Sequence, residues 1–235
     1  MIERSDFNDD TTALNYARAR GYCSYSSIKM IRDCESPGYS EEIWFEFGKE
    51  LHSRLLENKK IKTLSADEEE MLAVMLKKLR AHPVAKQLLA KSRNEQQFDV
   101  FIYGVRVLGY IDILNVDSVA DLKTTKCNTM KAFVAQMDFL QAALYLKATG
   151  RKDFYYLGIS KLPPYDVFPF SVKQYPVRLA LAQFSMRRLL MYIKSKWGCD
   201  HRDKSKRSTL VKIAKGGERE VCTTCGGEFK IVKRA

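Results

Sequence analysis

Two neighbouring stretches constrain this chain more than any other feature. Val105–Leu114 (VRVLGYIDIL) and Ser118–Thr125 (SVADLKTT) predict consecutive β-strands, and only three residues separate them. Side chains two residues apart in a strand point to the same face of a sheet. Asp121 and Lys123 are therefore expected to project together, while Leu122 between them turns into the core.

Asp112 adds a second carboxylate to this patch, because the short connection lets the first strand place it beside Asp121 and Lys123. Carboxylates hold hard divalent cations, and a lysine can orient a water molecule or stabilise charge on a phosphate. Metal-dependent hydrolysis of a phosphodiester needs these groups. Most isolated Asp-x-Lys triplets lie on solvated strand edges, so the neighbouring segments have to support this interpretation.

Residues 40–58 predict an amphipathic helix whose buried row is Ile43, Phe47, Leu51 and Leu55. Trp44, Gly48 and His52 form the adjacent row. Glycine in a helix interior costs roughly 1 kcal/mol relative to alanine, so Gly48 indicates that another backbone or a ligand approaches there. His52 is then either a metal ligand or a boundary histidine with an ordinary hydrogen bond.

Residues 128–149 predict one long helix that ends at Gly150. Gln141 and Tyr145 lie four residues apart on it and share a face. Two interpretations fit this pair. They are either ordinary residues at the edge of the core, or groups that reach the phosphate backbone and Lys123 across the sheet.

Taken in order, these segments resemble the PD-(D/E)XK nucleases, in particular the RecB-like branch and its phage RecE-like exonucleases. The resemblance covers roughly residues 23–172, with the N-terminal segment 25–37 and the strand within 154–164 included. Its specificity comes from the order and spacing of several loose motifs: Gly48-x-x-x-His52, Gly109-Tyr110-Ile111-Asp112, Asp121-Leu122-Lys123 and Gln141-x-x-x-Tyr145.

The resemblance implies a role for each matching position. The implied metal ligands are one imidazole, two carboxylates and a backbone carbonyl: His52, Asp112, Asp121 and Leu122. The implied catalytic lysine and its supporting helix pair are Lys123, Gln141 and Tyr145. Glu95 lies near an extra acidic position of some relatives and is a weaker metal candidate. The resemblance also implies Mg²⁺ or Mn²⁺ as the metal and a restriction-endonuclease-like core.

The remaining pattern agrees with such a core. A capping box of Ser65 and Glu68 opens a helix that His82-Pro83 ends, and Gly104 marks the turn of a hairpin. Further strands are expected near 154–159 and 167–172, followed by a last helix at 179–197. This order predicts an α/β fold with a central mixed β-sheet flanked by helices. We expect a nuclease domain at 1–198 and a small basic, Cys-containing appendage at 199–235.

The appendage 199–235 is strongly basic and contains a Cys-x-x-Cys-Gly sequence typical of a zinc knuckle. The expected Zn²⁺ ligands are Cys199, His201, Cys222 and Cys225. Alternatively, these cysteines are free thiols in a reducing cytosol or a redox pair. A less favoured alternative is an iron–sulfur cluster that adds Cys34 to the three cysteines. Cys23 and Cys127 are expected to be ordinary buried or boundary thiols.

Composition agrees with a protein that acts on a polyanion. The 235 residues suffice for one substantial core plus an appendage, and the formal net charge is +12. No apolar run is long enough to span a membrane. The polar N-terminal segment, MIERSDFNDD, resembles neither a signal peptide nor a transit peptide. We therefore expect a cytoplasmic protein of a bacterium or a phage-infected cell.

The function that these features favour is a metal-dependent DNA exonuclease of recombination, repair or phage DNA metabolism. A single-strand annealing or recombination protein is a conceivable partner, and an oligomer is compatible with the sequence. Within the same class, the alternative is a structure-specific or restriction-type endonuclease. From another class, the alternative is a nuclease-fold nucleic-acid-binding protein with little cleavage.

Overall fold

The structure is a computed structural model that describes residues 14, 17, 18, 20–33, 42–196, 207–213 and 217–222; side chains are described within 14–33 and 46–196. The chain divides into two units. One comprises residues 1–38, 99–109 and 184–235, and the other comprises residues 39–98 and 110–183. Among the described residues, no helix is both long and apolar enough to cross a membrane.

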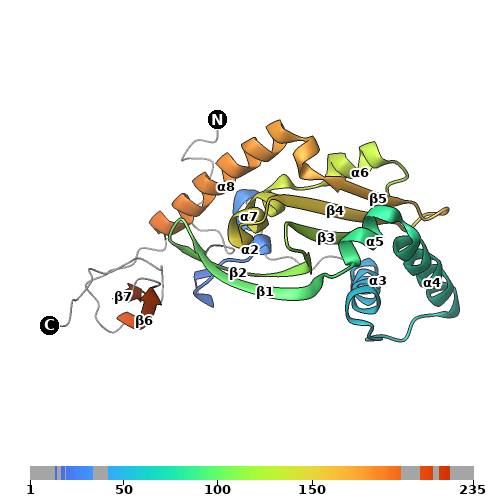
Figure 1. The fold of residues 1–235 in the computed structure, drawn as a ribbon, viewed down its shortest axis with the longest axis horizontal. Coiled ribbons are helices and arrows are strands. Elements are labelled where there is room, and N and C mark those ends of the chain that lie inside the picture. The colour runs from blue at the N-terminus through green and yellow to red at the C-terminus, as the bar shows by residue number, and fades with distance from the viewer. Residues whose placement is uncertain are drawn as a thin grey trace. The chain divides into compact units, whose positions relative to one another are not determined.

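A five-stranded sheet with the order β1-β2-β3-β4-β5 forms the centre of the fold (Figure 1). Its strands are β1 Arg93–Ile102, β2 Val105–Leu114, β3 Ser118–Thr125, β4 Asp153–Ser160 and β5 Val167–Ser171. The β3–β4 pair is parallel, whereas β2–β3 and β4–β5 are antiparallel. This mixed sheet confirms the predicted fold class, and β2 and β3 have the predicted bounds.

Helices flank the sheet. They are α2 Tyr25–Asp33, α3 Glu42–His52, α4 Ala66–Ala81, α5 Pro83–Leu89, α6 Met130–Gln136, α7 Phe139–Thr149 and α8 Pro176–Lys196. A π-helical turn, η2 (Ser53–Glu57), continues α3, and a 3-10 turn, η3 (Val172–Gln174), precedes α8. A separate hairpin consists of β6 Arg207–Ile213 and β7 Gly217–Cys222. The capping box of Ser65 and Glu68 is present at the start of α4, as predicted.

The two faces of the sheet have different cores. On one face, aliphatic side chains of α3, α4 and α5 pack against Leu122 of β3 and Leu157 of β4. The other face carries an aromatic cluster in which Phe133 of α6 contacts Phe168 and Phe170 of β5. Burial of both faces explains why β4 is buried at nearly every position, whereas β2 alternates between buried and partly exposed residues.

The prediction of one helix over residues 128–149 is wrong, because the chain breaks into α6 and α7 at Met137 and Asp138. Asp138 has an extended backbone, and its carboxylate accepts a hydrogen bond from the Leu140 amide at 3.0 Å, which caps α7. Arg178 donates hydrogen bonds to the carbonyls of Val134 and Met137 at 3.0 and 3.2 Å. A distant arginine thus satisfies carbonyl groups that the break exposes.

Gly158 of β4 marks the closest approach between the sheet and α6. A Cβ atom at Gly158 would lie 2.4 Å from the Phe133 ring, and Phe133 is completely buried. The ring is packed against Phe168 and Phe170, so it has no room to withdraw. The absence of a side chain at Gly158 is therefore what allows α6 to pack onto this face.

Gly158→Ala should lower the free energy of unfolding by roughly 1–3 kcal/mol, because overpacking displaces a buried ring. Thermal unfolding should show this as a melting temperature several degrees lower. The matched control is the double variant with Phe133→Leu, whose loss should be smaller than the sum of the two single losses. Additive losses would show that the ring and Gly158 do not constrain each other.

Candidate active site

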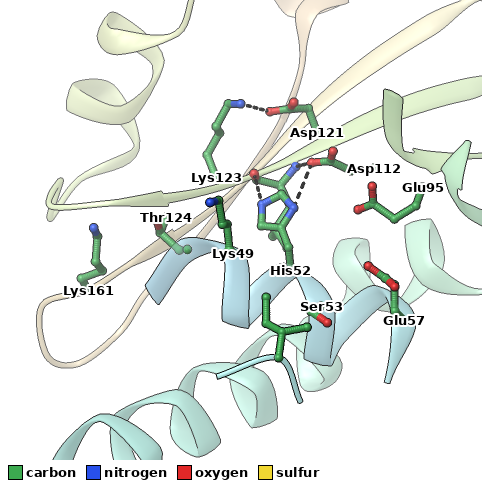
Figure 2. A pocket seen from close by; sticks show the side chains of 13 residues that line it. Lys49, His52, Ser53, Glu57, Glu95, Asp112, Asp121, Lys123, Thr124 and Lys161 are labelled. Atoms are coloured by element: carbon green, nitrogen blue, oxygen red, sulfur yellow. Dashed lines mark hydrogen bonds and ion pairs between the residues drawn. The ribbon is translucent and has the colours of Figure 1, made fainter. Parts of the chain in front are cut away.

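A cavity of about 730 Å³ opens beside β3 and is lined by His52, Asp112, Asp121 and Lys123 (Figure 2). Glu95 of β1 lines the same cavity. The structure therefore brings together side chains from α3, β1, β2 and β3. The two farthest apart in the sequence, His52 and Lys123, are 71 positions apart. The predicted proximity of Asp112, Asp121 and Lys123 is present.

The Leu122 peptide groups lie at the centre of this site. Strand β2 pairs with β3 through Ile113–Ala120 and Leu114–Val119. At Leu122 the amide N–H donates to the Asp112 carboxylate at 2.8 Å, and His52 Nε2 lies 2.8 Å from the Leu122 carbonyl oxygen. Site side chains thus satisfy backbone groups that a neighbouring strand would otherwise bond.

Asp121 is 3% exposed and faces α7 rather than His52. Gln141 Nε2 donates a hydrogen bond of 2.5 Å to Asp121 Oδ1, and Lys123 Nζ forms an ion pair of 2.8 Å with Asp121 Oδ2. Apart from the Lys123 ammonium, Oδ2 is buried without a partner among the described residues. A buried, incompletely satisfied carboxylate oxygen in a polar cavity suits a cation.

Tyr145 lies one turn beyond Gln141 on α7, and both are buried, so the predicted common face exists. Burial, and secondarily the negative charge of Asp121, raise the pKa of Tyr145 well above its ordinary value. The phenol is therefore neutral at physiological pH, and it lies on the same buried face as Gln141, which donates to Asp121.

His52, Glu95 and Asp112 form the group of potential metal ligands among the described residues, with one donor atom from each lying within 4.8 Å of the others. The nearest His52 and Asp112 atoms, Nδ1 and Oδ2, are 3.6 Å apart. Glu95, which the sequence offered only as a weaker metal candidate, is therefore one of the three residues of this group. Its φ of 50° is a left-handed conformation that a non-glycine residue rarely adopts within a strand.

The electrostatics of the cavity favour a bound cation. Burial, followed by repulsion from Asp121, raises the pKa of Asp112 well above its ordinary value. Burial, followed by repulsion from Glu57 and Asp121, raises the pKa of Glu95. Burial lowers the pKa of His52, which leaves a neutral imidazole able to donate a lone pair. This oxygen-rich donor set with one imidazole fits Mg²⁺ or Mn²⁺.

Lys123 keeps its charge inside this environment. Burial alone would lower the pKa of Lys123, but attraction to Asp121, their hydrogen bond and attraction to Asp112 together raise it. The ammonium therefore remains protonated at neutral pH, at the edge of the carboxylate group. This protonated form can bind a phosphate oxygen or orient a water molecule through its N–H groups.

Gly48 marks a close approach of α3 to β3. A Cβ atom there would lie 3.3 Å from the Thr124 hydroxyl oxygen, so α3 approaches β3 closely one turn before His52. This approach brings the His52 ring within reach of the Leu122 carbonyl. The neighbour that approaches Gly48 is a side-chain hydroxyl, whereas the sequence predicted another backbone or a ligand.

Sequence reasoning missed Glu50, which is fully buried on α3. Its carboxylate accepts hydrogen bonds from Arg54 Nε at 2.6 Å and from the amides of Ile61 and Lys62 at 3.1 and 2.9 Å. Glu50 thereby anchors the loop after η2, which carries Ile61 to the cavity. The sequence signal for Glu50 was its spacing of four residues before Arg54. This spacing is also common on exposed helix faces, so it did not indicate a buried carboxylate.

Two lysines of the cavity were also missed. Lys49 and Lys161 line it together with Thr124, and Figure 2 shows Thr124 and Lys161 on the side away from Glu95 and Glu57. The cavity thus has an acidic part and a basic part. Lys49 follows Gly48 directly and lies three residues before His52, a helical spacing that could have revealed it.

The cysteine predictions have different outcomes. Cys23 and Cys127 are buried free thiols, as expected, and burial raises the pKa of Cys23 to about 12. Cys222 ends β7, but its side chain is not described. The other predicted zinc or cluster ligands lie outside the described residues: Cys34, Cys199, His201 and Cys225. The metal-binding prediction for the appendage 199–235, and its separation from 1–198, stay predictions.

Comparison with solved structures supports the fold. A candidate exonuclease from Eubacterium rectale is similar at 12% sequence identity and a TM-score of 0.55, over 88% of this chain and 95% of that one. An alkaline exonuclease from Laribacter hongkongensis is similar at 14% identity over 78% of this chain and 93% of that one. Its TM-score of 0.37 is too low to extend the comparison. At such identities the first likeness shows the fold alone.

No curated protein sequence matches this chain. A protein-family model does match, over residues 34–198, and its description is "PDDEXK-like domain of unknown function (DUF3799)". The matched segment contains every predicted metal and catalytic residue of the cavity. Because this match spans well over half of the 235 residues, the chain belongs to the PDDEXK-like family DUF3799, within the PD-(D/E)XK nuclease superfamily.

Proposed function

We propose that this protein is a metal-dependent DNA exonuclease that hydrolyses phosphodiester bonds. The observation that carries the proposal is the convergence of Asp112, Asp121 and Lys123 in one cavity with His52 and Glu95. Family membership supports a nuclease. The positive net charge of +12 in a chain that concentrates carboxylates at one point favours a nucleic-acid substrate.

The proposed metal ligands are carboxylates, the imidazole and the backbone carbonyl of β3: His52, Asp112, Asp121, Leu122 and the weaker candidate Glu95. When bound, Mg²⁺ or Mn²⁺ would lower the pKa of an attacking water and neutralise charge on the phosphate. Lys123 would orient that water, because its ammonium is held beside the carboxylates by Asp121 at 2.8 Å. Gln141 would fix the Asp121 carboxylate through their 2.5 Å hydrogen bond.

The basic part of the cavity would contact the rest of the nucleic acid. Lys49 and Lys161 line it with Thr124, which offers a hydroxyl donor for a phosphate oxygen. The Lys161 amide donates to the Thr125 carbonyl at 2.7 Å, so the backbone that carries this lysine is anchored to the end of β3. Such contacts orient a strand without reading its sequence.

The proposed biological setting is recombination, repair or phage DNA metabolism in the bacterial cytoplasm. A single-strand annealing or recombination protein is the proposed partner class. The order of motifs from Gly48 to Tyr145 supports this setting, since it resembles that of phage RecE-like exonucleases.

The direct test is digestion of end-labelled linear DNA and covalently closed circular DNA, each with Mg²⁺ and with EDTA. We expect linear DNA to be degraded from its ends with Mg²⁺, circular DNA to persist, and EDTA to stop the reaction. Cleavage of the circle would replace the exonuclease with an endonuclease. No cleavage of either DNA, with DNA binding retained, would favour a nuclease-fold binding protein.

Asp121→Asn and Lys123→Ala should each lower the cleavage rate by about 100-fold or more, because both side chains are proposed to act at the reacting phosphate. DNA binding should change little for Lys123→Ala. Its melting temperature is measured alongside the rate, because the change also removes the ion-pair partner of the buried Asp121 carboxylate. Asp117→Asn is the matched control, because Asp117 is 71% exposed and pairs with Lys152 away from the cavity. Near-normal cleavage by Asp121→Asn would exclude this site.

His52→Ala and Glu95→Gln should each raise the Mn²⁺ concentration required for half-maximal thermal stabilisation, by about ten-fold or more. The melting temperature measured against Mn²⁺ concentration reports metal binding without requiring cleavage. A purely structural His52 would lower the melting temperature at every Mn²⁺ concentration and leave the midpoint of the titration unchanged. Glu70→Gln, at an exposed position of α4 outside the cavity, is the control for a general loss of charge.

Protein purified without chelator should contain one Zn²⁺ per chain, bound by Cys199, His201, Cys222 and Cys225 in tetrahedral geometry. Elemental analysis measures this directly, and Cys222→Ser should remove the zinc while Mg²⁺-dependent cleavage persists. Stoichiometric iron with a brown colour would instead indicate the cluster that includes Cys34. An absence of both metals would exclude either site.

A further inference from the structure

The tip of the β1–β2 hairpin displays an aromatic residue in an unusual backbone conformation. Tyr103 and Gly104 connect the two strands and have φ values of 51° and 78°. A two-residue turn with positive φ at both positions normally favours asparagine followed by glycine. A bulky residue in the left-handed region is strained, and such strain is often associated with function. Tyr103 nevertheless remains 37% exposed.

A cavity of about 580 Å³ lies at this tip and is lined by Tyr103, Arg187, Met191, Lys194 and Ser195. All of these residues belong to the same structural unit. The Arg187 guanidinium lies over the Tyr103 ring, 5.8 Å from its centroid. The Lys194 ammonium lies 2.7 Å from where a Gly104 Cβ atom would be, so its side chain extends over the turn. Among the described residues that line this cavity, none is acidic.

The α8 residues of this cavity belong to one exposed row. Arg187, Met191 and Lys194 are spaced by four and three residues, so they share a helix face. Phe184 precedes them in the same row and is 61% exposed, and Met191 is 54% exposed. Apolar and cationic side chains therefore alternate along this face. We call the surface formed by Tyr103 and this row the hairpin-tip surface.

This combination suits an unpaired nucleotide strand. The exposed rings and the planar guanidinium can stack on bases, which are available when a strand is not paired. The ammonium can contact a phosphate, and the row gives repeated positions for successive nucleotides. A protein partner would have to match closely spaced cations as well as rings. The net charge of +12 further favours a polyanion over a neutral partner.

We propose that the hairpin-tip surface binds single-stranded DNA, with a base stacked at Tyr103 and Arg187 and a phosphate at Lys194. This site is separate from the carboxylate cavity, whose lining residues all belong to the other structural unit. The choice of DNA over RNA rests on the proposed function. The binding itself does not depend on metal or cleavage.

The test measures binding of a labelled oligothymidylate to the full chain by fluorescence anisotropy, in EDTA so that cleavage does not contribute. Tyr103→Asn removes the ring and keeps a residue suited to the turn, and it should weaken binding about 5- to 100-fold. Tyr103→Phe retains the ring and should bind like the unaltered protein. Arg187→Gln is a second stacking variant, on an exposed helix position, should Tyr103→Asn unfold.

Lys194→Gln should lower the slope of log affinity against log salt by about 0.7, the value for one lost phosphate contact with a single strand. Lys77→Gln on α4 is the matched control, because Lys77 is an exposed helical lysine outside both cavities and should leave the slope unchanged. A folded Tyr103→Asn variant with unaltered affinity would overturn the proposal. So would a loss for Lys77→Gln equal to that for Lys194→Gln, since it would indicate general charge attraction.

A duplex of the same length is the second probe. Tyr103→Asn should weaken duplex binding much less than single-strand binding, and an equal effect on both would overturn the assignment to unpaired bases. Retained single-strand binding in a protein that cleaves no DNA would count against the proposed exonuclease alone. The two proposals therefore fail separately.

Discussion

The hydrogen bonds made by the Leu122 peptide groups are the constraint on which the candidate site depends. The Leu122 amide donates to Asp112 at 2.8 Å, and the carbonyl lies 2.8 Å from His52 Nε2. Because buried backbone groups need partners, these two side chains support the sheet as well as the site. Helix α3 and strands β2 and β3 thereby meet at Leu122, beside the charged cavity. Loss of either hydrogen bond would affect both the fold and the site.

Close contacts across the sheet set how near the helices can come to this residue. Gly48 lets α3 approach Thr124, which places His52 at the strand. Gly158 lets Phe133 pack onto the opposite face, where its ring contacts Phe170 of β5. Because protein interiors are close-packed, a methyl group added at either glycine would have no empty volume to occupy. The approach of α3 and of α6 to the sheet is therefore set by contacts at these two glycines.

The charges of the site oppose folding in part. Burial and mutual repulsion raise the pKa values of Asp112 and Glu95, so ionising them at neutral pH costs folding free energy. A carboxyl group whose pKa is raised on folding lowers stability as the pH rises through its unfolded pKa toward its folded one. A bound cation would offset this cost. This electrostatic cost is expected at a site whose residues are selected for chemistry rather than for stability.

Local periodicity in the chain was enough to predict several features of the fold and of the site. The strands β2 and β3, the projection of Asp121 with Lys123, and the common face of Gln141 and Tyr145 all follow from spacings of two and four residues. The capping box of α4 is equally local, because its hydrogen bonds join residues three positions apart. The metal-ligand roles were implied by family resemblance and are still to be tested.

Features that depend on partners far apart in the sequence became visible in the folded chain alone. The break between α6 and α7 is stabilised by Arg178, which lies 41 residues from Met137. Glu95 of β1, which has a left-handed backbone conformation, lies with His52 and Asp112 only in the folded chain. Lys161 enters the cavity where its backbone is bonded to the end of β3. Long-range hydrogen bonds and packing fix these positions, and no local pattern in the chain encodes which groups will meet.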